Sequence, residues 1–500
     1  MVIRWRAGTA SRSDSPFVSF DEDTVTVIGD DTRVTRSYLA VIDDEVVIGH
    51  DLGAVVAELG GGRERVDPVA LSNILVHGFV IIPETVYRPV LQLDMGDVAI
   101  VARRDGRLQC ELRPGHAFCN ERSRQDEEPS EDRLFAVLAE AVDRTVRRAG
   151  GSGHLMLSAG VDSMSLALAL AAGGYRDVIC TTSRSGPDDR EWEYAAAMCR
   201  KLGLRHEVLD PPSPEVSRPV LEHIFTESAE PAGEALFQYG HAVSRVVADG
   251  HRWIMDGTGN DHYMGYGPGG TMRWKLRLRA RNRTVAGLLA QIIPMHSPLN
   301  YLLRSRLATT FPLRLLRDHE AAVVYRDAVP AQAAMWDRST EREHLDDWDL
   351  MNSVRRGSMT KVRIAATAFG LEPLFPNSDR DLADYCFNLP EAERFDRKTG
   401  RRKVLLRRML ASRLGYDEKV AGKNPFHIDR VRFLQENRSF VLDEIASCSL
   451  WTGQALPMAT AWIDDLGKRP MLSHALIPLF QISGWHNHST YLTGIDGGGR

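Results

Sequence analysis

The sequence predicts an α/β protein with an N-terminal part of the α+β type, a central parallel sheet and a helical C-terminal part. Short β-rich runs separated by turns fill residues 17–113, and one helical stretch at 67–77 interrupts them. From residue 134, strands alternate with helices, which is typical of a parallel sheet covered on both faces. After about residue 266 the pattern is mainly helical. These three observations predict the fold class.

The first domain is assigned to residues 1–120. Its strands are expected at 24–28, 34–42, 45–48, 98–102 and 108–112, where β-branched residues alternate with polar ones. Turn sequences between these runs favour antiparallel pairing. A polar stretch at 121–132 is typical of a linker, so the second domain is expected to span 133–495.

The central sheet is expected to contain four strands and the helices between them. The strands are expected at 154–157, 178–182, 206–209 and 252–255, and the helices at 164–172, 190–201 and 240–248. Open parallel sheets bind ligands beyond the carboxyl ends of their strands. The loops that follow these strands are therefore the candidate binding site.

The loop Ser158-Ala159-Gly160-Val161-Asp162-Ser163 follows the first strand of this sheet and precedes a helix. The N–H groups and the dipole at a helix N-terminus attract anions, and glycine lets the backbone approach closely. A carboxylate at Asp162 repels phosphate unless a divalent cation lies between them. The loop indicates a nucleotide whose pyrophosphate is held with Mg²⁺. The same residue types also form a plain helix N-cap, and the loop has neither a Walker lysine nor a Gly-x-Gly-x-x-Gly pattern.

A second loop, Asp256-Gly257-Thr258-Gly259-Asn260-Asp261, follows the strand at 252–255. Its two glycines allow close contact with a nucleotide, and Asp261 offers a second carboxylate. Taken alone, this loop is better explained as a solvated turn. Two such loops at strand ends of one sheet favour a site, in which Asp162 and Asp261 share one Mg²⁺.

Composition excludes several classes of function. A net charge of −5 over 500 residues gives no reason to expect nucleic acid as a partner. The six cysteines are scattered, which suits reduced thiols in a cytoplasmic protein. We find neither a signal peptide nor a segment long and apolar enough to span a membrane.

Six segments in order resemble asparagine synthetase-like enzymes, which are PP-loop ATP pyrophosphatases of the adenine nucleotide alpha hydrolase-like type. The first loop is similar to their Ser-Gly-Gly-x-Asp-Ser pyrophosphate loop, and the second to their Ser-Gly-Glu-Gly-x-Asp-Glu segment. The other four contain Asp189-Arg190-Glu191-Trp192, Pro376-Asn377-Ser378-Asp379, Arg402-Lys403-Val404-Leu405-Leu406-Arg407 and Gly422-Lys423-Asn424-Pro425-Phe426. The resemblance covers residues 135 to 430 or so.

The resemblance implies chemistry at the α-phosphate of ATP, with Mg²⁺ as cofactor. A substrate carboxylate attacks, pyrophosphate leaves and an acyl-adenylate forms; an amine then captures the acyl group and AMP departs. The nucleotide-binding residues that it implies are Leu157, Ser158, Gly160, Asp162, Ser163 and Gly257. The implied metal ligands are Asp162 and Asp261.

Two lysines complete the implied site. Lys403 would meet phosphate, and Lys423 would stabilise charge in both half-reactions. The alternatives are a solvated helix face for Lys403 and a surface loop for Lys423. Only eight of the 62 basic residues are lysines, which favours a functional role for Lys423.

The resemblance also implies a vestigial glutaminase-like domain at the N-terminus. Asparagine synthetases place a cysteine nucleophile directly after the initiator methionine, whereas this chain has Val2 there and its first cysteine is Cys110. Residues 67–98 still resemble the last part of a glutaminase domain. We therefore expect no glutamine hydrolysis, and an amine that belongs to the substrate.

Among amide-forming relatives, the residues favour a lasso peptide cyclase, a macrolactam synthetase. Such an enzyme adenylates an Asp or Glu side chain of a precursor peptide and closes a ring with the N-terminal amine. A leader peptidase is an expected partner, and a leader-recognition protein is a further candidate. β-Lactam synthetases use a glutamate about twenty residues before the Pro-x-x-Asp element, and residues 353–370 contain no glutamate.

Two alternatives stay open: a small-molecule amide synthetase of β-lactam or asparagine type, and a catalytically inactive nucleotide- or peptide-binding module. The basic run at 273–283 would suit an acidic leader peptide, although a solvated face is the commoner explanation. His262 stands where the family carries a glutamate, and the sequence assigns it no role.

Overall fold

The computed structural model of this chain describes residues 2–6, 15–30, 32, 34–80, 82–113, 129–184, 186, 189–233, 236–264, 358–396, 398–421 and 429–493. Lys423 and the basic run at 273–283 lie outside the described residues, as does the side chain of His262.

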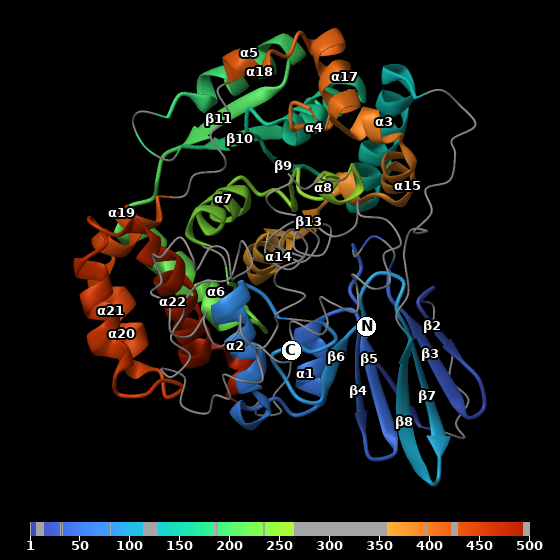
Figure 1. The fold of residues 1–500 in the computed structure, drawn as a ribbon, viewed down its shortest axis with the longest axis vertical. Helices are drawn as coiled ribbons and strands as arrows, with labels where there is room; N and C mark the ends of the chain where they lie inside the picture. The colour runs from blue at the N-terminus through green and yellow to red at the C-terminus, as the bar shows by residue number, and fades with distance from the viewer. Residues whose placement is uncertain are drawn as a thin grey trace.

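Five parallel strands form the central sheet, in the order β11–β10–β9–β12–β13 (Figure 1). In that order their bounds are Arg205–Leu209, Ile179–Ser183, Gly153–Met156, Trp253–Met255 and Glu372–Leu374. The predicted parallel sheet is confirmed, with β13 as a strand that the sequence did not predict. A three-residue run containing Pro373 carries no alternation, so its pairing with β12 was not visible in the pattern.

Neighbouring residues of these strands point to opposite faces, and each face has its own core. Leu155 packs with helices α3, α4, α5 and α17, whereas Met156 packs with α6, α7 and α14. The bounds of the first group are Glu131–Ala149, Val161–Ala172, Glu191–Leu202 and Val404–Leu414. Those of the second group are Pro214–Glu227, Phe237–Ala248 and Met359–Ala368. The sheet is therefore buried on both faces, as the continuous apolar strands predict.

Two antiparallel four-stranded sheets form the N-terminal part, in the orders β1–β5–β4–β6 and β2–β3–β7–β8. The strands β1 to β8 are Val2–Arg6, Val18–Phe20, Thr24–Ile28, Tyr38–Ile42, Glu45–Gly49, Val90–Gln92, Val98–Arg104 and Arg107–Arg113. Trp5, Val27 and Val101 meet in a core between the two sheets. Helices α1 (Leu52–Glu58) and α2 (Pro68–His77) pack against the other face of the first sheet. The α+β character is confirmed; the relation to glutaminase remains a prediction.

Several predicted boundaries differ from the structure, among them two helix starts: α4 begins at Val161 and α7 at Phe237, three residues before the expected positions. The strand expected at 34–42 begins only at Tyr38, because the Asp30 carboxylate accepts N–H bonds from Thr32 and Thr35 and holds a turn there. The expected linker ends at 132, yet α3 begins at Glu131. The Ser130 side chain caps that helix by accepting a hydrogen bond from Arg133 N–H. Acidic residues in the first turn interact favourably with the helix dipole and stabilise this start.

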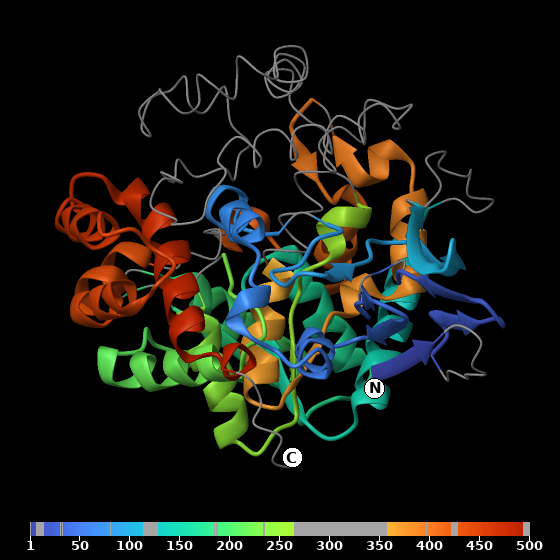
Figure 2. The ribbon, with the colours of Figure 1, turned by 90° about the horizontal axis from the view of Figure 1, so that it is seen from below.

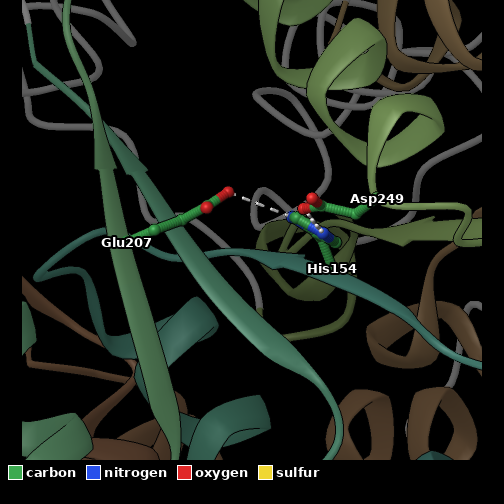
Figure 3. Close-up of side chains that lie close together, drawn as sticks. All are labelled: His154, Glu207 and Asp249. Atoms are coloured by element: carbon green, nitrogen blue, oxygen red, sulfur yellow. Dashed lines mark ion pairs between the residues drawn. The ribbon is translucent and has the colours of Figure 1, made fainter.

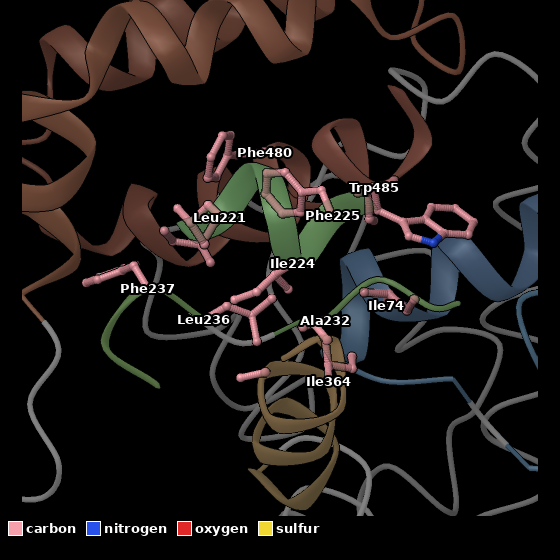
Figure 4. Packing of buried hydrophobic residues seen from close by; sticks show 14 of the residues in the cluster. Ile74, Leu221, Ile224, Phe225, Ala232, Leu236, Phe237, Ile364, Phe480 and Trp485 are labelled. Carbon is pink, nitrogen blue, oxygen red and sulfur yellow. The ribbon is translucent and has the colours of Figure 1, made fainter. Parts of the chain in front are cut away.

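The C-terminal helices wrap around α6 and reach the N-terminal part. They are α19 to α22, with bounds Arg430–Glu436, Arg438–Ser447, Ala455–Asp464 and Ser473–His488. Phe225 of α6 meets Phe480 of α22 edge to face, and Ile74 of α2 lies in the same core (Figure 4). From below, these helices and the N-terminal strands lie at opposite sides of the molecule, with α2 between them (Figure 2).

The remaining described elements are short. They are η1 (Arg63–Arg65), α8 (Asn260–Tyr263), η5 (Pro376–Ser378), α15 (Arg380–Asn388), α16 (Glu391–Arg394), β14 (Phe395–Asp396), β15 (Arg401–Arg402), α18 (Glu418–Ala421), η6 (Pro470–Leu472) and η7 (Thr490–Leu492). Within the described part of the chain, no helix is long and apolar enough to cross a membrane.

Candidate nucleotide-binding and catalytic site

The strand order places the two predicted loops side by side. Within the sheet, β10 and β11 lie on one side of β9, and the later strand β12 lies on its other side. Ligands of open α/β sheets bind at such a switch point, beyond the carboxyl ends of the strands. The loops after β9 and β12 flank this point, so the topology supports the position predicted for the site.

The loop after β9 is held by two serines. Ser158 N–H donates to Ser163 Oγ at 3.0 Å, and the Ser163 hydroxyl donates back to the Ser158 carbonyl, also at 3.0 Å. Leu157, 3% exposed, still donates to the Thr181 carbonyl of β10. The serines thus close the turn that brings Asp162 into the first turn of α4.

Two residues outside this loop fix its middle. Ala159 N–H donates to Glu191 Oε1 at 2.7 Å, and the Tyr416 hydroxyl donates to the Ala159 carbonyl at 2.7 Å. Burial raises the pKa of Tyr416 to about 12, so its hydroxyl stays protonated as a donor. Ala159 avoids positive φ, which is why alanine is tolerated where the resemblance has glycine. Gly160, at φ −74°, is the N-cap of α4.

The loop after β12 packs directly against the first one. A Cβ atom at Gly257 would lie 3.0 Å from Ser163 N, and one at Gly259 would lie 2.4 Å from Ser378 Oγ. Gly259 also has φ +126°, which only glycine adopts readily. Asp256 accepts bonds from Thr258 N–H and from the Tyr239 hydroxyl, each at 2.8 Å. Close backbone packing therefore favours glycine at 257, and the positive φ favours it at 259.

Lys403 brings the two predicted metal ligands together. Its ammonium donates to both oxygens of Asp162, at 2.6 and 2.7 Å, and pairs with Asp261 Oδ1 at 2.8 Å. The side chain of Lys403 is 6% exposed, against 16% for Asp162 and 35% for Asp261. A solvated helix face for Lys403 is therefore excluded, and one small cation can contact both carboxylates.

The backbone aims the lysine into the site. Lys403 is the N-cap of α17 and has φ +56°, an uncommon conformation for a residue other than glycine. Its N–H donates to the Arg394 carbonyl at 2.6 Å, and its carbonyl accepts from Arg407 N–H at 2.9 Å. These bonds hold a conformation that would otherwise be costly, a pattern common at functional sites.

The protonation state of Lys403 follows from its neighbours. Burial disfavours the ammonium, but the Asp162 and Asp261 carboxylates outweigh this effect and raise the pKa of Lys403 above its ordinary value. The side chain is therefore a permanent cation at neutral pH. A group that must stabilise negative charge on phosphate needs this property.

Buried polar atoms beside the second loop fit a bound polar group. Among the described residues, Asn260 Oδ1, Asn377 Oδ1 and Ser378 Oγ are buried and have no hydrogen-bond partner. The amide nitrogens of the two asparagines are used: Asn377 donates to the Gly257 carbonyl at 2.7 Å, and Asn260 to Asp162 Oδ1 at 3.3 Å. Because buried oxygens seldom lack partners, these atoms are suited to meet a ligand or its waters.

Some contributors could not be predicted from the sequence. Glu191 belongs to a segment that the resemblance singled out, but neither its contact with Ala159 nor that of Tyr416 could be predicted from a local pattern. The sequence did single out the segment containing Asp379, but this carboxylate caps α15 and pairs with Arg144 at 2.6 Å. Its role in the structure is to hold the helix next to the site.

The fold and these loops define an α/β protein whose switch point can hold an anion and a cation side by side. The chain belongs to the asparagine synthase family, because the family described as Asparagine synthase matches residues 133–430. The family consists of ATP-dependent ligases that form amides, and Mg²⁺ is typical of it. Among curated proteins, no relative matches.

One solved structure with a detectable likeness is an NH3-dependent NAD synthetase from Campylobacter jejuni in complex with a nitrate ion. The two sequences are 15% identical, and the match covers 28% of this chain and 62% of that chain, less than two thirds of its length. At a TM-score of 0.20, the likeness says nothing about the arrangement of the site.

Proposed function

We propose that this protein forms an amide bond through an acyl-adenylate and that its substrate is a peptide. The enzyme activates an Asp or Glu side chain with ATP, releases pyrophosphate, and closes a macrolactam ring with the peptide's own N-terminal amine. A leader peptidase, and with it a leader-recognition protein, would prepare that substrate. The proposal makes the chain a lasso peptide cyclase.

The contact of Lys403 with both carboxylates carries the adenylation half of this proposal. Charge develops on the leaving pyrophosphate, so cations must lie where it departs. Asp162 and Asp261 would hold Mg²⁺, which takes one or two protein carboxylates together with substrate phosphates. When bound there, Mg²⁺ would neutralise the negative charge that develops on the leaving pyrophosphate. Lys403 provides a second, fixed cation, and Ser158 marks the loop that would cradle the pyrophosphate.

Among its described residues, the N-terminal part offers no activated thiol for releasing ammonia from glutamine. Among its described residues the cysteine is Cys110, which is partly buried on β8. Burial raises the pKa of Cys110 above its ordinary value, so the thiolate is scarce at neutral pH. An amine that belongs to the substrate is consistent with this environment.

A small surface hollow lies at the same edge of the sheet. It lies where β11 ends and α7 begins, and its walls are both aromatic and charged. The lining residues are Pro211, Pro212, Phe237, Gln238, Asp429, Arg432, Phe433 and Glu436. The Phe237 and Phe433 rings stack with their centroids 3.9 Å apart. Asp429 follows directly on the segment 422–428, which contains Lys423, so this hollow adjoins the proposed catalytic loop in sequence.

The decisive experiment measures ATP–pyrophosphate exchange and ring closure with the purified protein and Mg²⁺. The probes are peptides with a free N-terminus and one Asp or Glu at varied positions, alongside free amino acids. We expect one such peptide to support exchange, AMP release and the loss of one water by mass spectrometry. The same peptide with an acetylated N-terminus should support exchange without ring closure, because only the second half-reaction needs the amine.

Three results would overturn the proposal. If free amino acids support exchange and none of the peptides does, the enzyme is a small-molecule amide synthetase. If purified protein releases glutamate from glutamine, the amine comes from ammonia. An absence of exchange with every probe, while ATP still binds, would favour the inactive binding module.

A further inference from the structure

A second polar cluster lies on the α7 face of the same sheet, away from the two loops. It joins His154 of β9, Glu207 of β11 and Asp249 at the end of α7 (Figure 3). One nitrogen or oxygen atom from each residue lies within 4.8 Å of the others. His154 is fully buried, whereas Glu207 and Asp249 keep 21% and 18% of their side chains exposed. The cluster is therefore anchored in the core and still open to ions from solvent.

A chain of hydrogen bonds fixes the orientation of the imidazole. The Thr181 hydroxyl donates to Glu207 Oε1 at 3.1 Å, so its oxygen is left to accept from His154 Nδ1–H at 2.8 Å. This arrangement places the proton of the neutral ring on Nδ1 and leaves a lone pair on Nε2. Metal-binding histidines typically have their second nitrogen engaged in this way by a hydroxyl or carboxylate.

The lone pair of Nε2 faces a second electron-rich atom. Nε2 lies 3.2 Å from Asp249 Oδ2, yet each of these buried atoms has no hydrogen-bond partner among the described residues. Two acceptors so close repel each other unless a positive charge lies between them. The space between these two atoms is therefore suited to a cation.

Neighbouring charges do not fill that position. Arg245 pairs with the outer oxygens, Asp249 Oδ1 at 3.0 Å and Glu207 Oε2 at 3.4 Å, and leaves the oxygens that face the imidazole. The His251 ring meets that of His154 edge to face, with centroids 5.0 Å apart. Burial lowers the pKa of His154 to about 4, more than Glu207 and Asp249 raise it, so the ring is neutral at pH 7.

We propose that His154, Asp249 and Glu207 form a binding site for one divalent transition-metal ion, such as Zn²⁺, Co²⁺ or Mn²⁺. Nε2 and Asp249 Oδ2 are its ligands from the protein, and Glu207, whose Oε1 lies 3.4 Å from Nδ1, positions the imidazole from the edge strand. A site with an imidazole nitrogen suits these ions better than Ca²⁺ or Mg²⁺, which prefer oxygen ligands alone. The ion would tie α7 to β9 and β11, and the site is independent of the proposed nucleotide site.

Metal titration of the full-length protein without ATP tests this assignment. Zn²⁺ binding is followed by calorimetry, Co²⁺ binding by its visible absorption, and the number of bound ions by native mass spectrometry. We expect one ion per chain. Asp249→Asn should weaken binding on the order of 100-fold, since the amide keeps the shape but removes the charge. Glu207→Gln should weaken binding in the same direction.

Matched controls separate this site from other carboxylates. Asp210→Asn alters an exposed aspartate just after β11 that pairs with Arg184, and should leave the affinity for Zn²⁺ unchanged. Asp162→Asn should also leave it unchanged, which distinguishes this site from the nucleotide site. Equal Zn²⁺ affinity in native protein and Asp249→Asn, or a Co²⁺ spectrum without a protein-dependent band, would sink the assignment. In that case a proton shared by His154 and Asp249 fills the gap.

Discussion

Two places in the central sheet each gather two carboxylates around one nitrogen-bearing side chain, and they differ in what lies between the carboxylates. At the carboxyl edge, the Lys403 ammonium contacts Asp162 and Asp261 directly. Its positive charge is permanent, and its pKa is raised above the ordinary value. The carboxylates there are compensated in the free protein.

On the α7 face, the group between the two carboxylates is a neutral imidazole. His154 reaches toward Glu207 and Asp249, while the cation of Arg245 sits on their outer oxygens. The atoms that face one another are therefore all acceptors, apart from Nδ1–H.

The difference shows that the position of a cation, more than the number of charges nearby, decides whether facing carboxylates are compensated. Each cluster has two carboxylates and one basic side chain that is charged at pH 7. In one, the backbone of Lys403 at φ +56° directs the ammonium between the carboxylates. In the other, Arg245 of α7 pairs with the outer carboxylate oxygens and does not reach the oxygens that face His154. Coulomb energy falls with distance, so a cation compensates only the carboxylate oxygens that it directly contacts.

The largest expected effect comes from removing one carboxylate at the edge. Asp162→Asn or Asp261→Asn should lower AMP formation by about 10³-fold, because each removes charge that positions Mg²⁺ and Lys403. AMP release at saturating ATP is the measurement, with thermal unfolding to show that the fold persists. Asp381→Asn, an exposed aspartate on α15, is the control. Native turnover in either variant would contradict a shared metal site.

Removing the edge cation should test the comparison directly. Lys403→Met should lower AMP formation by ~10²–10³-fold and leave two carboxylates without their cation. Mg²⁺ should then raise the Tm of the variant more than that of the native protein, since carboxylates without a nearby ammonium bind the divalent ion more tightly. Thermal unfolding over a Mg²⁺ series measures this. Equal Mg²⁺ shifts in both proteins would mean that the ammonium does not weaken Mg²⁺ binding.

A third buried group, His486 of α22, shows how burial changes the pKa of a histidine that has no carboxylate facing it among the described residues. Its Nδ1 lies 3.7 Å from Cys448 Sγ, and burial, with Arg63 nearby, lowers its pKa to about 4. The unfolded state, with a histidine pKa of about 6.5, binds the proton more tightly. The free energy of unfolding should therefore fall by up to about 3 kcal/mol between pH 6.5 and pH 4.

Chemical denaturation across this pH range gives the measurement for His486. In His486→Gln the pH dependence should become flatter by that amount, whatever the change in absolute stability. An unchanged slope in the variant would show that His486 is protonated in the folded protein.

The smallest expected effect concerns the packing of the two loops. Gly257→Ala would place a methyl group 3.0 Å from Ser163 N, so the loops must separate by a few tenths of an ångström. We expect the KM for ATP to rise about tenfold with little change in Tm. Gly453→Ala, where the added methyl meets nothing within 4 Å, is the matched control. A variant with native KM would show that the nucleotide does not depend on this contact.

Local patterns were sufficient to predict the two loops of the site. Ser158, Asp162 and Asp261 follow strands whose apolar runs are continuous, and parallel strands end at one edge of a sheet. Predicting Lys403 needed the family resemblance, because it belongs to another part of the chain. The contacts of Glu191 and Tyr416 with Ala159 were out of reach, since they arise only when distant elements pack together.

Alternation of strands and helices, together with polar residues at strand ends, was enough to predict the parallel sheet and the polar side chains at its carboxyl edge. These features depend on neighbours along the chain, which backbone geometry relates directly. Only the tertiary structure decided which side chains meet: Lys403 with Asp162 and Asp261, and His154 Nε2 with Asp249 Oδ2. Electrostatic pairing depends on distances of a few ångström between side chains from separate elements, and long-range packing sets those distances.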